Sequence, residues 1–389
     1  MPLYNDRTAA ALYAKSDDFK TAEQELREDL KKLREAQAAF ENMSKAEIEA
    51  AVAEIPHPGA LPTWEQDEKP FIIPFEHRWT DHREARDWAA QVLSGVITFA
   101  ADGSTVPRRT DLSIPVGLVQ VGWFINPHDG QDSYVKDVEV EVLSPKELIS
   151  DSHESRFADL EIEWRRYLME TERDIMFMGM HANKSAVVFL DGTLTISFVS
   201  AQEMLPYRQK RYLMEINRLL DISDEMRVPV VGYVDASYAS DLTTLIRHVS
   251  TYDGSSIPDA TLLRTQMQWG DRCRTFICAR DDEVPGNEYY REKVCFTYLK
   301  TTQNNPPARL EIPRWVFDDP ATYEWVLDVV RAECVVGLGY PYPLETADAA
   351  AVLTAEDRER FYRMFQEFAE QEDIPVRFSR KSISKRGRR

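Results

Sequence analysis

Two aspartates follow matched apolar stretches and could together bind a divalent cation. Asp102 follows ITFAA, Asp191 follows VVFL, and each precedes a glycine. Both are expected at the carboxyl ends of buried strands, which parallel pairing brings to one edge of a sheet. Carboxylates at close range repel each other unless a positive charge lies between them. One Asp-Gly pair is ordinary turn chemistry, but two in matching positions favour a metal site with oxygen ligands.

A third acid is expected on the helix between these strands. At about 100° per residue, counted from the apolar Leu168, Glu172 lies about 40° away and Glu170 about 200° away. Glu172 is therefore predicted to face the sheet, and Glu170 is the alternative, because buried acids are rare unless paired or metal-bound. Asp235, after the apolar segment VVGYV, is predicted to be either a fourth ligand or a surface turn residue.

Such carboxylates suit Mn²⁺ or Mg²⁺ and a reaction at a phosphate ester. Two ions roughly 4 Å apart can activate water and neutralise the leaving oxygen in phosphodiester hydrolysis. Arg108 and Arg109, shortly after Asp102, are expected to contact nucleic-acid phosphates. Zinc is disfavoured, because the four cysteines lack paired spacing and the seven histidines include no HxxxH pair.

The elements that must position these residues follow an informative order. Three strands joined by short loops, which favours antiparallel pairing, are predicted at residues 96–101, 116–125 and 135–143. Helices then alternate with strands, at residues 154–180, 185–190, 203–220, 228–234 and 241–249. Helical crossovers require parallel neighbours. The predicted fold class is α/β: a ribonuclease H-like mixed sheet, an antiparallel meander plus a parallel half, flanked by helices.

Flanking segments extend this body. Residues 1–62 are expected to form a helical arm and a proline-rich linker, residues 63–376 the folded body, and residues 377–389 a basic tail. The tail is either a disordered end or an arm that binds phosphate or a partner. The whole chain has 47 Lys and Arg against 66 Asp and Glu, a net charge of −19, which predicts weak autonomous affinity for DNA.

The predicted location is the cytoplasm. No segment reaches the roughly 18 apolar residues of a membrane span. The N-terminus also lacks the apolar run of a signal peptide. We therefore expect no contact with a membrane.

A series of motifs resembles the NurA family of prokaryotic DNA-end nucleases, over about residues 95–365. The motifs are ADGS at 101–104, DLSIPVGLVQVGWF at 111–124, LDGTL at 190–194, PVVGYV at 229–234, ARLEIPRWV at 308–316 and GYPYPLETAD at 339–348. The resemblance implies a ribonuclease H-like nuclease domain and Mn²⁺-dependent 5′ to 3′ exonuclease activity with single-strand endonuclease activity. It further implies a nucleoid-associated homodimer that docks on the hexameric ATPase HerA in double-strand break resection.

Carried over to this chain, the resemblance implies Asp102, Glu172 and Asp191 as metal ligands and Tyr340 as the residue that positions the substrate. Eight residues after that tyrosine the family pattern has a histidine, whereas this chain has Asp348. Asp348 is expected either to join the ligands or to weaken catalysis. The alternative function is therefore a catalytically weakened protein of this family that docks on or regulates the ATPase.

Overall fold

The computed structural model describes residues 3–109, 111–131, 133–148, 158–195, 206–280 and 293–377 of the 389. The chain divides into two compact units. One combines Met1–Arg78 with Val234–Leu310, and the other combines Trp79–Tyr233 with Glu311–Arg389. Of the predicted basic tail, Arg377 is described, and residues 378–389 lie outside the described part.

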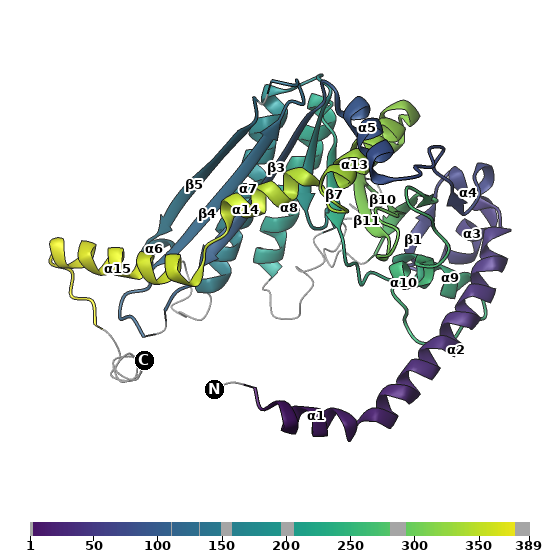
Figure 1. Cartoon of the computed structure of the whole chain (residues 1–389), viewed down its shortest axis with the longest axis horizontal. Coiled ribbons are helices and arrows are strands. Elements are labelled where there is room, and N and C mark those ends of the chain that lie inside the picture. Colours follow the sequence, from purple (N-terminus) through teal and green to yellow (C-terminus); the bar gives the residue numbers. More distant parts are fainter. Residues whose placement is uncertain are drawn as a thin grey trace. The chain divides into compact units, whose positions relative to one another are not determined.

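The second unit contains the strands that were predicted first. They lie in the order β7-β6-β3-β4-β5 (Figure 1). Their bounds are β3 (Ile97–Val106), β4 (Gly117–Asn126), β5 (Val135–Leu143), β6 (Ala186–Asp191) and β7 (Val230–Val234). β4 pairs antiparallel with both β3 and β5, whereas β6 pairs parallel with both β3 and β7. The predicted meander and parallel half are therefore confirmed.

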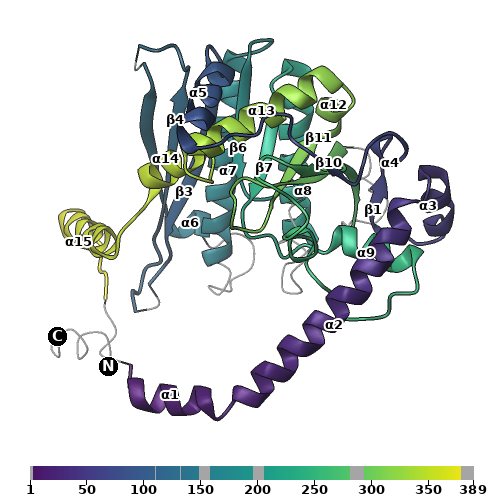
Figure 2. The same ribbon diagram turned by 45° about the vertical axis from the view of Figure 1, so that its right-hand side comes forward.

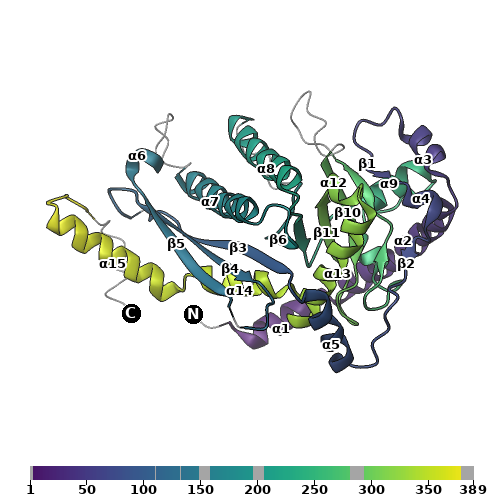
Figure 3. The same ribbon diagram turned by 90° about the horizontal axis from the view of Figure 1, so that it is seen from above.

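Helices cover both faces of this sheet (Figure 3). The helices are α5 (His82–Leu93), α6 (Pro145–Leu148), α7 (Ala158–Met180), α8 (Pro206–Met226), α12 (Arg314–Phe317), α13 (Pro320–Val336), α14 (Tyr342–Ala351) and α15 (Ala355–Gln371). On one face, Phe99 stacks on Phe177 of α7 with ring centroids 4.5 Å apart. On the other, the Thr98 hydroxyl donates to Glu333 of α13 at 2.7 Å. Because neighbouring strand residues point to opposite faces, α7 and α13 lie on opposite sides, and Figure 2 shows α5 beside α13.

The first unit contains the helical arm and a smaller antiparallel set of strands. Its helices are α1 (Asn5–Tyr13), α2 (Ser16–Glu41), α3 (Lys45–Val52), α4 (Glu65–Glu68), α9 (Asp241–Val249) and α10 (Asp259–Leu263). Its strands are β1 (Gly59–Pro62), β2 (Ile72–Ile73), β8 (Arg272–Cys273), β9 (Phe276–Ala279) and β10 (Val294–Leu299), and β11 (Ala308–Pro313) crosses the division between the units. A capping box of Ser44 and Glu47 begins α3.

The arm buries one end of α2 and exposes the other. Leu33 and Phe40 are buried, whereas Phe19 is 62% and Leu26 45% exposed. Figure 1 shows α1 and the first half of α2 projecting from the rest of this unit. None of the helices in the described ranges combines the length and apolar character needed to cross a membrane.

Candidate active site

Asp102 and Asp191 occupy matching positions on neighbouring parallel strands. The register of β3 and β6 ends with Ala101 beside Leu190, and the next residue of each strand is an aspartate. Residues paired in register point to the same face of a sheet. The structure therefore brings these two carboxylates together, as the sequence predicted.

Asp102 does not end its strand, and that part of the prediction is wrong. β3 continues to Val106, and Asp102 and Gly103 pair with Gly122 and Val121 of β4. The apolar stretch stops at Ala101, but the strand goes on because β4 continues to supply backbone partners. Gly103 is therefore not a turn residue.

The environment of Asp102 disfavours its charged form. The pKa of Asp102 is raised to about 6, mainly by burial and in smaller part by the charges of Asp191 and Asp348. Loss of solvent around the carboxylate also raises the pKa of Asp191, again with a contribution from Asp348. Asp348 lies on α14, which crosses the sheet face of Asp102: a side chain at Gly122 would meet Ala350 of α14 at 2.7 Å. Three aspartates therefore share one electrostatic environment.

Tyr340 is held beside this group by the turn between α13 and α14. Its hydroxyl hydrogen bonds to Asp191, which lowers the pKa of that carboxyl and partly offsets its loss of solvent. Its ring meets Tyr233 edge to face, with centroids 5.1 Å apart. The Tyr233 hydroxyl in turn donates to the carbonyl of Gly339 at 3.1 Å. Gly339 has a φ of 117°, a backbone conformation that favours glycine.

A second glycine turn fixes the chain just after Asp191. Gly192 has a φ of 130° and its amide donates to the Tyr233 carbonyl at 3.0 Å. The Thr193 hydroxyl and the Thr195 amide then donate to buried Glu311, at 2.7 Å and 3.0 Å. The glutamate of the ARLEIP motif thus anchors the loop that carries Asp191, a role that the sequence analysis missed.

The helix carboxylate that packs against Gly103 is Glu170, on the α7 face of the sheet, whereas Asp102 faces α14. A Cβ atom at Gly103 would lie 2.4 Å from Glu170 Oε1 and 2.7 Å from Arg166 Cγ. The pKa of Glu170 is raised to about 7, mainly by burial; the charge of Arg166 opposes this rise and the charge of Asp102 contributes to it. Only a glycine at this position of β3 leaves room for the carboxylate.

Glu170, rather than the predicted Glu172, is the acid of α7 that packs against Gly103. Glu172 is half-buried and its charge acts on Arg165, which binds Glu141 of β5 at 2.6 Å. Leu168, the chosen reference, is itself only half-buried. α7 packs on β3 through Phe177 and on α8 through Tyr167, whose ring lies 4.9 Å from Tyr212, so its apolar pattern does not mark a single face.

We expect Glu170→Gln to reduce metal-dependent DNA cleavage by about 100-fold, because a proposed metal-binding carboxylate is lost. Glu172→Gln removes the same charge two residues away and is expected to leave cleavage within about twofold. Initial rates on end-labelled DNA with Mn²⁺ measure both effects. The reverse order of effects would restore Glu172 as the helix ligand.

The two predicted phosphate-binding arginines are engaged with acids. Arg109 makes a bidentate contact with Asp111 at 2.9 Å and 2.8 Å, and Arg108 Nε lies 3.8 Å from Asp159. Both follow the end of β3 at Val106, which is already about 13 Å along the strand from Asp102. Asp235 lies in an exposed turn after β7, in the other compact unit, and is not counted in this site.

The donor set suits a hard cation, although it is not arranged as a finished metal site. Among the residues described, no three His, Cys, Asp or Glu side chains form a group that could hold a metal ion. The raised pKa values of Asp102 and Glu170 instead indicate that no nearby positive charge fully compensates the burial of these two carboxylates. Mn²⁺ and Mg²⁺ prefer such oxygen ligands. Arg166 meanwhile pairs with Glu170 at 2.6 Å.

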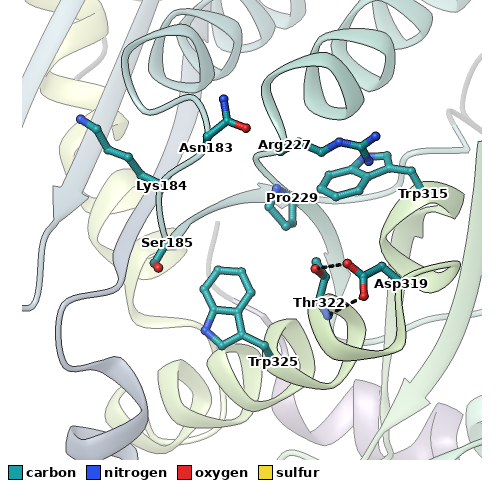
Figure 4. Close-up of a pocket in the computed structure, with 9 residues that line it drawn as sticks. All are labelled: Asn183, Lys184, Ser185, Arg227, Pro229, Trp315, Asp319, Thr322 and Trp325. Carbon is teal, nitrogen blue, oxygen red and sulfur yellow. Dashed lines mark hydrogen bonds between the residues drawn. The ribbon is translucent and has the colours of Figure 1, made fainter.

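A cavity lies at the other end of β6, away from the group of three aspartates. It has a volume of about 720 Å³, and Figure 4 shows Trp315 and Trp325 on either side of Pro229. Ser185, which lines it, precedes Asp191 by six residues, or roughly 20 Å of extended chain. This cavity therefore does not contain the candidate reaction centre.

Comparison with known proteins agrees with the motif analysis. Residues 96–353 match the family model of the NurA domain. Among curated proteins, no sequence matches this chain.

Solved structures with a related arrangement are distant in sequence. The NurA nuclease from Sulfolobus solfataricus has 16% identity and a TM-score of 0.48, covering 71% of this chain and 84% of its own. A NurA structure with manganese has 9% identity and a TM-score of 0.43, covering 89% and 96%. The catalytic domain of human endonuclease V has 10% identity and a TM-score of 0.34, covering 78% and 93%.

Proposed function

This chain belongs to the NurA family, and we propose that it is a divalent-metal-dependent deoxyribonuclease with its reaction centre at Asp102 and Asp191. Its class is that of a nuclease, a phosphodiester hydrolase. The observation that carries the proposal is the register of β3 and β6, which places the two aspartates side by side. Tyr340, Glu170 and Asp348 complete the proposed site.

The proposed metal ligands are Asp102 and Asp191, with Glu170 from α7 and Asp348 from α14. Bound Mn²⁺ or Mg²⁺, as one ion or two, would supply charge neutralisation and an activated water for attack on phosphorus. The chain itself does the positioning. Tyr340 holds Asp191 through its hydroxyl and is proposed to position the substrate next to that carboxylate. Gly103 leaves room for Glu170 to pack against β3.

Further parts of the proposal rest on the family resemblance. They are a ribonuclease H-like classification of the sheet, 5′ to 3′ exonuclease and single-strand endonuclease activity, a homodimer, and docking on a HerA-type hexameric ATPase in end resection. We also propose residues 63–376 as the nuclease domain, residues 1–62 as an appended arm and residues 377–389 as a basic tail. A cytoplasmic, nucleoid-associated location accords with these roles.

Replacement of Asp348 tests whether this chain is an active nuclease or a catalytically weakened docking protein. We expect the wild-type protein to degrade end-labelled DNA with Mn²⁺ and to stop when EDTA removes the metal. Asp348→His relieves the repulsion that Asp348 exerts on Asp102 and Asp191, so the size of any gain in rate measures how far Asp348 limits the chemistry. Absence of cleavage by both proteins, with the ATPase present, would reject the nuclease proposal and favour the docking protein.

A further inference from the structure

A cavity of about 1120 Å³ lies on the same sheet face as Asp102. Its lining includes Phe124 of β4, which follows Gly122, the register partner of Asp102, by two residues. Side chains two residues apart on a strand point to the same face, roughly 7 Å from each other. Tyr342 of α14 lines the cavity from the helix that also carries Asp348. The cavity and the candidate active site thus share β4 and α14.

Two tyrosine rings pack around buried Phe124 in this cavity and remain partly open to solvent. The Phe124 ring lies 5.8 Å from Tyr134 and 5.7 Å from Tyr342, measured between centroids. Tyr134 is 59% exposed and Tyr342 37% exposed. Rings that serve as core packing are buried, whereas exposed rings at the edge of a cavity offer surfaces on which unpaired bases stack.

Two cations on the cavity lining are unneutralised. Arg86 and Lys136 are exposed, and within the described ranges neither has a carboxylate within salt-bridge distance. Arg86 Nε makes a 3.4 Å contact with the His82 carbonyl. By contrast, His128 of the lining is held 3.3 Å from buried Glu333.

The cavity lining also includes an acid, Asp129, whose carboxylate is held by hydrogen bonds from nearby residues. Its carboxylate accepts hydrogen bonds from the Ser133 hydroxyl and, at 2.9 Å, from the Gln131 amide. Among the described residues Asp129 forms no salt bridge with Arg86 or Lys136, and the two cations outnumber this acid in the lining. In a chain with a net charge of −19, such a local pair is where a phosphate backbone can make contact.

We propose that this cavity binds single-stranded nucleic acid beside the reaction centre, with bases on Tyr134 and Tyr342 and phosphates at Arg86 and Lys136. The inference rests on the proposed nuclease function and adds where its substrate strand lies. Stacking on these rings needs bases that are not already paired and stacked in a duplex. The cavity therefore selects a single strand rather than a double helix.

The test is fluorescence anisotropy of full-length protein with a labelled single-stranded oligonucleotide in EDTA, so that binding is measured without cleavage. Arg86→Ala with Lys136→Ala is expected to make the slope of log affinity against log salt shallower by about 1.4, because two contacts to single-strand phosphates are lost. Tyr134→Ala is expected to weaken binding roughly tenfold through lost stacking. All three side chains are exposed, so the variants should keep the wild-type circular dichroism spectrum.

A matched control removes the same charge from the cavity at the other end of β6. Lys184 and Arg227 line that cavity (Figure 4), and replacing both with alanine is expected to leave the salt slope unchanged. An equal loss in this control, or stronger binding of duplex than of single strand at the wild-type cavity, would overturn the proposal.

The outcomes also separate this inference from the proposed function. If the cavity variants bind normally while Glu170→Gln loses cleavage, the single-strand site is rejected and the nuclease stands. If the wild type cuts no DNA but the cavity variants lose binding, the single-strand site stands without the nuclease.

Discussion

Asp102→Asn is expected to abolish metal-dependent DNA cleavage and, in metal-free buffer at neutral pH, to stabilise the fold. The loss in rate is expected to reach about 1,000-fold, because several kcal/mol of metal-based stabilisation would go with the ligand. The gain in stability follows from the environment of the carboxylate, which is buried and repelled by Asp191 and Asp348. Asparagine has nearly the same shape and no charge.

The pH dependence of unfolding tests the same cause. The pKa of Asp102 is raised from its usual 3.8 to about 6 in the folded protein. Between about pH 4 and pH 6 the folded state holds a proton that the unfolded state has released, so stability falls as pH rises through this window. Above that window the ionised Asp102 lowers the free energy of unfolding by its full amount, on the order of 2 kcal/mol.

Urea unfolding of the metal-free protein at several pH values measures this contribution. Asp102→Asn should flatten the fall between about pH 4 and pH 6, while Glu170, whose pKa is raised to about 7, keeps its own dependence. Asp87→Asn, at an exposed position of α5, is the control and should change neither rate nor stability. Wild-type cleavage by Asp102→Asn would remove Asp102 from the reaction centre.

Gly103→Ala is expected to reduce cleavage by about 100-fold, because a displacement of about 1 Å at a reaction centre costs that much. The added methyl group would lie 2.4 Å from Glu170 Oε1 and 2.7 Å from Arg166 Cγ. Glu170 and Arg166 must therefore shift away from β3. We expect the free energy of unfolding to fall by about 1 to 3 kcal/mol, which is typical of overpacking.

The matched control for this variant is Gly179→Ala. Gly179 lies on the same helix as Glu170, and a Cβ atom there would meet nothing within 4 Å, so alanine should be neutral or slightly stabilising. Cleavage and urea unfolding of both variants provide the comparison. If Gly103→Ala keeps wild-type cleavage, the close approach of Glu170 to β3 has no catalytic purpose.

The strand order and the pair of aspartates could be predicted from local patterns. Short loops force antiparallel neighbours and helical crossovers force parallel ones, and the observed pairing of β3 with β4 and β6 follows both rules. The matched apolar stretches before Asp102 and Asp191 then place the two aspartates at the same level of neighbouring strands. The end of β3 was misplaced, because hydrophobicity stops at Ala101 whereas backbone pairing with β4 continues to Val106.

The single-strand cavity could not be predicted from the sequence at all. Arg86, Phe124 and Lys136 come from three separate elements and meet Tyr342 only in the folded chain. Arg108 and Arg109 had the better position in sequence, directly after the Asp-Gly motif. The fold supplies acids that neutralise them, at Asp159 and Asp111.

By itself the sequence determined the alternation of elements, the family and the two aspartates, because these depend on local apolar pattern and on rules of chain connection. Only the tertiary structure decided that Glu170 rather than Glu172 packs against Gly103 of β3. Helical periodicity gives angles around an axis, but α7 has apolar contacts with both β3 and α8. Packing decides which side of α7 meets the sheet, and Glu170 packs at Gly103, the one residue of β3 that has no side chain.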